Sequence, residues 1–164
     1  MRSTQLTIRV HDIDPGPAFD RVKDFSRYPL LTDVVRSVTV HAVAEDEENS
    51  EWEVYFRNGI LRWTEVDRFD RHGLTISFDQ LDGDFAEFCG TWRISVDPAG
   101  CLIHFAAEFD FGIASLAGIL DPVAERVLKE TIARVVIGLF DDTEVVGDER
   151  LARTLGLTAG MRAY

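Results

Sequence analysis

Hydrophobic and polar residues alternate one by one along much of the chain, which is the pattern of strands that bury one face. The clearest case is the stretch 78–94, where an Asp-Gly-Asp turn at 82–84 joins two such runs. The second run has apolar side chains on one face: Ala86, Phe88, Trp92, Ile94 and Val96. Two adjoining strands with one apolar face each need a shared core, and we expect the rest of the chain to supply it.

The same alternation predicts further strands on both sides of this hairpin. They cover 6–10, 38–44, 52–57, 60–69 and 101–111. The segments between them carry turn residues: the charged run 45–49, Asn58-Gly59, Arg71-His72-Gly73 and Pro98-Ala99-Gly100. Asn58-Gly59 favours a type I′ turn, which needs positive φ at both central residues.

Helical spacing appears in two parts of the chain. After Asp14-Pro15, apolar residues recur every three or four positions until about Ser26, and Tyr28-Pro29 should interrupt this helix. Residues 30–35 permit a second short helix. The range 121–146 predicts one long helix with a wide apolar stripe, capped by Asp121 and begun by Pro122.

This order of elements predicts an α+β fold of the helix-grip type. About seven antiparallel strands would form a curved sheet around the long C-terminal helix, with two short helices after the first strand. We expect one domain over 1–146, and a flexible or loosely docked polar tail over 147–164. Such an arrangement often leaves a cavity between the sheet and the helix.

The composition limits the classes of function that we expect for this protein. Eleven Phe and three Trp suit either a core or an apolar cavity. The formal charge of −12 argues against nucleic acid and against charge-driven docking on anionic membranes. No apolar run is long enough for a membrane span or a signal peptide, so we expect a cytoplasmic protein. Cys89 and Cys101 should be reduced core residues.

Three stretches, in this order, resemble one superfamily: 15–40, 81–94 and 103–116, the last followed by the long helix. Together they are similar to START/Bet v1-like (SRPBCC) proteins, in the branch of polyketide cyclase/dehydrases and coenzyme Q-binding proteins. The resemblance covers roughly residues 3–146. Asp84 departs from it, because this branch usually has proline there.

The resemblance implies an aromatase/cyclase that works without a cofactor. In that family a deep pocket holds a poly-β-ketone tethered to an acyl carrier protein and directs aldol closure and dehydration. An arginine on the fourth strand is thought to polarise a carbonyl. Trp63 matches the preceding tryptophan, but Asp67 stands at the arginine position, and Arg68, one residue later, would point to the other face unless the strand bulges.

Because this arginine is displaced, a second hypothesis stays open. The protein would then be a non-catalytic carrier of a quinone, a lipid or a polyketide. A carrier needs few titratable groups in its cavity, whereas a catalyst needs at least one. An acyl carrier protein is a candidate partner only for the first hypothesis. The sequence does not indicate the oligomeric state.

The inner face of the sheet determines the candidate residues. We expect the cavity to be lined by Tyr28, Trp52, Tyr55, Phe56, Trp63, Phe78, Phe88, Trp92 and Phe109. Alternation also turns Glu65 and Asp67 inward, where a buried carboxylate is costly unless protonated or paired. Alternatively, the strand leaves the core by that point and these carboxylates are solvated, which is the interpretation we favour for Asp67.

Four residues are candidates for catalysis: Glu65, Arg57, Arg68 and His104. Glu65 would be a general acid–base with a raised pKa. Arg57 would enter the cavity only through a bulge near Asn58. An exposed strand position explains Arg57, Arg68 and His104 equally well. No Ser/His/Asp order, Gly-rich phosphate loop or metal-ligand spacing occurs in the sequence, so we expect no metal and no cofactor.

Overall fold

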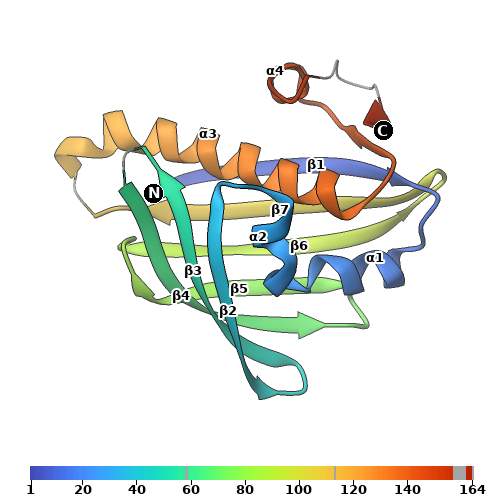
Figure 1. The fold of residues 1–164 in the computed structure, drawn as a ribbon, viewed down its shortest axis with the longest axis horizontal. Helices are drawn as coiled ribbons and strands as arrows, with labels where there is room; N and C mark the ends of the chain where they lie inside the picture. The colour runs from blue at the N-terminus through green and yellow to red at the C-terminus, as the bar shows by residue number, and fades with distance from the viewer. Residues whose placement is uncertain (58, 113, 157–161, 164) are drawn as a thin grey trace.

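The long sheet predicted from the alternating pattern is present, and one long helix lies along it (Figure 1). The computed structural model describes residues 1–57, 59–112, 114–156 and 162–163. In this part of the chain nine antiparallel strands form one sheet in the order β2-β3-β4-β5-β6-β7-β1-β8-β9. The helix-grip prediction is therefore confirmed, and the two strands beyond the expected seven are short.

The elements have the following bounds. The strands are β1 (Arg2–His11), β2 (Val35–Ala44), β3 (Glu47–Phe56), β4 (Gly59–Asp70), β5 (Thr75–Gly83), β6 (Glu87–Asp97), β7 (Gly100–Asp110), β8 (Thr143–Val145) and β9 (Arg162–Ala163). The helices are α1 (Pro15–Val22), the 3₁₀ turn η1 (Phe25–Arg27), α2 (Tyr28–Leu31), α3 (Ala114–Leu139) and α4 (Glu149–Thr154).

The long helix differs from its prediction at both ends. It begins at Ala114, so Asp121 is not its cap and Pro122 lies inside it. It ends at Leu139, because the segment that follows pairs with β1 as β8 instead of continuing the helix. Thr143 and Val145 of that strand are buried, and Glu144 between them is not. Tertiary pairing thus overrides the helical pattern that we extended to residue 146.

Two predicted boundaries differ from the structure: the interruption of the first helix and the turn between β3 and β4. Tyr28-Pro29 does not interrupt a helix but begins α2, since proline suits the first turn, where its missing N–H costs nothing. The β3–β4 register pairs Phe56 with Gly59, so the two loop residues are Arg57 and Asn58 rather than Asn58 and Gly59. Arg57 has φ 56°, and Asn58 lies outside the described residues.

The predicted tail contains further structure. Asp148 caps α4 by accepting a hydrogen bond from the Leu151 backbone N–H at 2.9 Å, and Leu151 and Ala152 are buried. β9 pairs with β8. Residues 157–161 and 164, also part of the predicted tail, lie outside the described residues. No helix among those described is long and apolar enough to cross a membrane.

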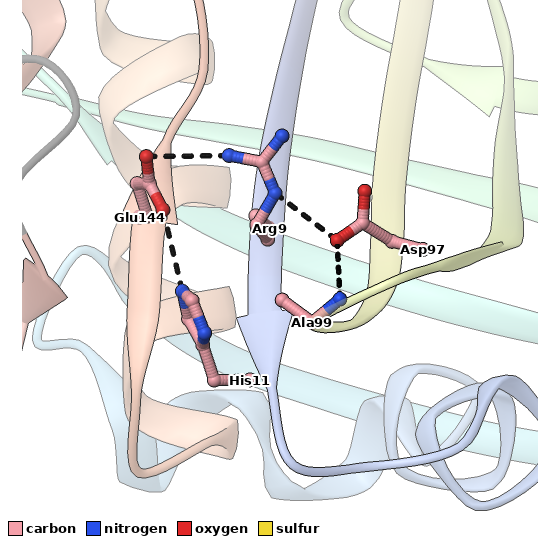
Figure 2. Close-up of polar contacts among 5 residues, drawn as sticks. All are labelled: Arg9, His11, Asp97, Ala99 and Glu144. Carbon is pink, nitrogen blue, oxygen red and sulfur yellow. Dashed lines mark hydrogen bonds and ion pairs between the residues drawn. The ribbon is translucent and has the colours of Figure 1, made fainter.

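Charged residues hold β8 to the sheet at the end of β1. Figure 2 shows Arg9 between two carboxylates: its Nε lies 3.1 Å from Asp97 Oδ2 and its Nη1 lies 3.2 Å from Glu144 Oε1. His11 Nε2 lies 3.2 Å from the other Glu144 oxygen, and the Ala99 N–H donates to Asp97. One arginine therefore connects β1, β6 and β8.

Arg9→Met should lower the free energy of unfolding by about 1–2 kcal/mol, measured by urea denaturation. The side chains of Asp97 and Glu144 are only 11% and 17% exposed, so both carboxylates would lose their shared cation while largely shielded from water. Arg36→Met is the control, because Arg36 is half-exposed and pairs only with Glu53 at 3.5 Å. Equal losses in the two variants would contradict the connecting role of Arg9.

Candidate functional site

A narrow apolar cavity lies between the inner face of the sheet and α3. Its volume is about 60 Å³, enough for a few water molecules and much less than a typical ligand site. It is lined by Phe25, Tyr28, Val35, Trp52, Val54, Phe56, Leu61, Trp63, Glu65, Phe78, Phe85, Phe88, Trp92, Phe105, Phe109, Ala124, Val127, Leu128, Thr131, Ile132 and Val135. A ligand of polyketide size would need these side chains, or α3, to move apart.

Two stacked tryptophans form one wall of the cavity. Trp52 on β3 and Trp63 on β4 are cross-strand partners, and their rings are 5.7 Å apart and nearly parallel. Each indole N–H must find an acceptor because both side chains are buried. Trp52 Nε1 donates to Ser50 Oγ, and Trp63 Nε1 donates to Glu65 Oε1, both at 2.7 Å.

The two acceptors, Ser50 and Glu65, belong to a cluster that contains two buried carboxyl groups, those of Glu65 and Asp67. Ser50 and Glu65 are directly opposite in the β3–β4 register, and Ser50 Oγ donates to Asp67 Oδ2 at 2.5 Å. Glu65 is 3% exposed and Asp67 is fully buried. The other Asp67 oxygen, Oδ1, has no donor in the rest of the described protein. Glu65 and Asp67 are close enough to share a hydrogen bond when one of them carries a proton.

Of the two carboxyl groups, Glu65 is the one that its surroundings favour as the neutral acid. Burial, followed by the hydrogen bond and the negative charge of Asp67, raises the pKa of Glu65 well above its usual range, and the Trp63 donor opposes this only in part. Burial also raises the pKa of Asp67, but hydrogen bonds from Glu65 and Ser50 favour its ionised form. The pair therefore holds one neutral carboxylic acid and one carboxylate, and only Glu65 lines the cavity.

Two further titratable groups adjoin this pair. Glu48 is opposite Asp67 in the register and only partly buried; burial and then Asp67 raise the pKa of Glu48 to about 7, and Lys23 opposes the shift. Tyr28 is fully buried and donates its hydroxyl to the Val22 carbonyl at 2.5 Å. Burial and then the Glu65 and Asp67 charges raise the pKa of Tyr28 well above its usual value.

Among the residues expected to line the cavity, Tyr55 alone lies elsewhere. Its neighbours Val54 and Phe56 point inward, so Tyr55 points outward and is 47% exposed. The other expected aromatic side chains are found in the cavity lining: Tyr28, Trp52, Phe56, Trp63, Phe78, Phe88, Trp92 and Phe109. Asp67 also differs from our interpretation, since it is buried rather than solvated.

Only Glu65 of the four candidate catalytic residues faces the cavity. Arg68 is exposed and lies 3.3 Å from Glu47 and 3.5 Å from Asp79. The β4–β5 register is irregular between Thr64 and Glu65, where β5 has one extra residue. The alternation of β4 is unbroken there, so Arg68 stays on the outer face. His104, also on the outer face, shares a 2.8 Å hydrogen bond with Thr7, and burial and then Arg93 lower its pKa.

Arg57 does not enter the cavity either. It follows β3 and is exposed, and the β3–β4 register is regular over the described pairs, from Glu47 with Arg68 to Phe56 with Gly59. We therefore exclude Arg57, Arg68 and His104 from the candidate active site. Ser50 and Glu48 were missed, because we interpreted 45–49 as a turn although β3 begins at Glu47. Strand alternation extended backwards from Trp52 would have placed both on the inner face.

Among the described residues, no group of three or more His, Cys, Asp or Glu side chains could hold a metal ion. The site is instead an aromatic cavity with one protonated carboxylic acid in its wall. Such a group can donate a hydrogen bond or a proton to an oxygen atom of a bound molecule.

Comparison with known protein families agrees with this architecture. The family model described as polyketide cyclase/dehydrase and lipid transport matches residues 12–136. The chain belongs to this family. The description covers both catalysis and transport, so membership leaves the role of the cavity open. A comparison with curated proteins found no match.

Solved structures share the fold of this chain at low sequence identity. The protein TTHA0849 from Thermus thermophilus is 21% identical with a TM-score of 0.76, over 84% of this chain and 94% of the other. The Zhui aromatase/cyclase from Streptomyces sp. R1128 is 14% identical with a TM-score of 0.67, over 84% and 92%. The major latex-like protein 151 of Panax ginseng is 11% identical with a TM-score of 0.63, over 84% and 95%.

Proposed function

We propose that the protein binds an apolar ligand of the poly-β-ketone type in the cavity and promotes its aldol closure and dehydration, with Glu65 as the general acid–base. One observation carries this proposal: a carboxyl pair with a shared proton opens into a cavity that is otherwise almost entirely apolar. An acyl carrier protein of a cytoplasmic polyketide assembly would deliver the chain. The family and an aromatase/cyclase of the same fold support this substrate class.

The energetic cost of the pair favours a catalytic role. Burying Glu65 and Asp67 together costs free energy that an apolar side chain at either position would not. Binding a hydrophobic ligand needs no ionisable group, whereas acid–base chemistry needs one whose pKa is near the working pH. The upward shift of the Glu65 pKa moves this carboxyl from a permanent carboxylate towards that range.

One carboxyl group can perform the proton transfers of aldol closure when a neighbouring group adjusts its pKa. The carbonyl oxygen that is attacked gains a proton, and the attacking carbon loses one. The attacking unit reacts as its enol: Glu65 donates its proton to the attacked carbonyl oxygen as the carbon–carbon bond forms, and its carboxylate takes the proton that the enol hydroxyl releases. During dehydration Glu65 donates to the departing hydroxyl, which leaves as water, and its carboxylate takes the proton from the adjacent carbon. Asp67 does not line the cavity, so it acts as a positioning residue through its hydrogen bond to Glu65.

A second function, transport without catalysis, is favoured by a different observation. No arginine, lysine or histidine of the described chain lines the cavity, so no cation can stabilise an enolate there. Hydrogen-bond donation by neutral Glu65 would then only orient a carbonyl-bearing ligand such as a quinone. The two functions differ in whether the ligand changes.

A reconstituted polyketide synthase distinguishes them. Ketosynthase, chain-length factor, acyl carrier protein and malonyl-coenzyme A produce unprocessed chains that close spontaneously, and products are separated by liquid chromatography and mass spectrometry. We expect the wild-type protein to increase one cyclised product, and Glu65→Gln to return the profile to that of the synthase alone. Glu108→Gln, on the outer face of β7, should behave as the wild type. A profile that changes equally with wild type and Glu65→Gln supports transport or shielding instead.

A further inference from the structure

A second hollow shares lining residues with the cavity and lies beside the β3–β4 turn. Its volume is about 200 Å³, and it is lined by Val34, Tyr55, Arg57, Val127, Glu130, Thr131 and Arg134. Val127 and Thr131 of α3 line both this hollow and the cavity. The two spaces therefore share the Val127 and Thr131 side chains, and a ligand that extended past these two side chains would occupy both. This hollow is called the mouth below.

Two arginines face this mouth from different elements. Arg57 comes from the β3–β4 turn and Arg134 from α3, and Glu130 is the single acid that lines the hollow with them. Neither arginine has an ion-pair partner among the described residues. Other described arginines also lack one, but Arg57 and Arg134 are the pair that faces the hollow next to the apolar cavity, where they outnumber the acid Glu130.

The backbone at Arg57 supports a role for its side chain. Its φ of 56° lies in the left-handed region, which glycine, asparagine and aspartate adopt more readily than arginine. Two-residue hairpin loops favour those residues for this reason. Asp12 and Leu74 also have positive φ, and one explanation for such a conflict at Arg57 is a function of its side chain. The long cationic side chain at the mouth provides that explanation.

We propose that Arg57 and Arg134 bind the carboxylate end of an amphipathic ligand whose apolar part enters the cavity. This inference rests on the binding part of the proposed function and concerns a released ligand with a free carboxylate, since a chain tethered to an acyl carrier protein ends in a thioester. The neutral donor Glu65 inside and the two cations at the mouth would together fix the direction in which the ligand lies. Guanidinium groups suit this task because they bind carboxylates through two parallel hydrogen bonds.

Octanoate and octanol provide a matched pair of probes, because they share the apolar chain and differ in the anionic end. Isothermal titration calorimetry would measure both against the wild type and the variants. Arg57→Gly and Arg134→Gln should each weaken octanoate binding by about two- to fivefold and leave octanol binding unchanged. Glu130→Gln should strengthen octanoate binding by about twofold. Arg93→Gln, exposed on the outer face of β6, controls for the loss of one positive charge.

Arg57→Gly also separates binding from folding. Glycine suits the observed φ, so the variant should melt at or above the temperature of the wild type while it loses affinity for octanoate. If the arginine variants change octanoate and octanol binding alike, or change neither, the mouth does not recognise anions and only this inference fails. If neither probe binds the wild-type protein, the binding function itself is wrong. Catalysis by Glu65 is tested independently by the synthase assay.

Discussion

Glu65→Gln should make the protein more stable than the wild type at pH 8, by a margin that shrinks as the pH falls towards 5. The reason is the proton that Glu65 keeps in the folded protein. Burial and the neighbouring Asp67 raise the Glu65 pKa in the folded state, whereas the unfolded chain has a pKa near the ordinary value of 4.5. Glutamine imitates the protonated acid, because its amide can accept from Trp63 and donate to Asp67.

The direction follows from proton binding in the two states. Below pH 4.5 both states of the wild type hold the proton, and Glu65 adds no pH dependence. Above it the unfolded chain releases the proton and the folded protein retains it, so the wild type loses stability as the pH rises towards the folded-state pKa. Each pH unit in this window removes about 1.4 kcal/mol from the wild type and nothing from the variant.

Urea denaturation at pH 5, 6, 7 and 8 measures this margin. Glu108→Gln is the matched control: its carboxylate is exposed on β7, so its difference from the wild type should stay the same at every pH. Asp67→Asn in the Glu65→Gln background should further reduce the loss of stability towards pH 8, because Asp67 also raises the pKa of Glu48. A margin for Glu65→Gln that does not change between pH 5 and 8 would mean that Glu65 is ionised in the folded protein, and the acid–base proposal would lose its basis.

The direction of the inner face could be predicted from the sequence because strand geometry fixes it. Alternation around Trp63 and Trp92 turns these side chains into the core, and it turns Glu65 with them. Alternation does not show how far along a strand the core extends. Asp67 is two residues beyond Glu65 and remains buried because Ser50, from the neighbouring strand, reaches its carboxylate. That contact depends on the β3–β4 register, which the turn sets.

The remaining differences arise where distant segments meet. β8 pairs with β1, more than 130 residues earlier in the chain, and this pairing ends α3 at a residue that local spacing favours for a helix. The position of Arg57 also depends on a distant segment. The sequence predicts it at the end of a strand beside a turn, but only the structure shows that it lines a hollow with Arg134 of α3. Local patterns could not have joined these two residues.

Gly90→Ala should cause the largest loss of stability among the single-methyl changes considered, about 3 kcal/mol or roughly 10 °C in melting temperature. An added Cβ at residue 90 would lie 2.4 Å from the Ala106 carbonyl oxygen on β7 and 2.4 Å from the Phe78 ring on β5. The first contact is with backbone in the middle of the sheet, so it cannot be relieved by a side-chain rotation. Glycine is therefore required here by space alone.

Gly16→Ala is the matched control, because no atom lies within 4 Å of the Cβ position at residue 16 and the residue is within α1. Alanine favours the helix, so this variant should be neutral or more stable by up to about 1 kcal/mol. Thermal unfolding of both variants checks the comparison.

Phe78→Leu in the Gly90→Ala background separates the two clashes at residue 90. Phe78 lines the cavity and stacks on Phe105 at 5.9 Å, so a displaced ring would also change the space open to a ligand. Partial recovery of the melting temperature would show that the ring accounts for part of the loss and that Gly90 shapes the cavity wall. If Phe78→Leu adds its own loss in full, the clash with the Ala106 carbonyl accounts for the effect, and Gly90 serves the sheet rather than the cavity.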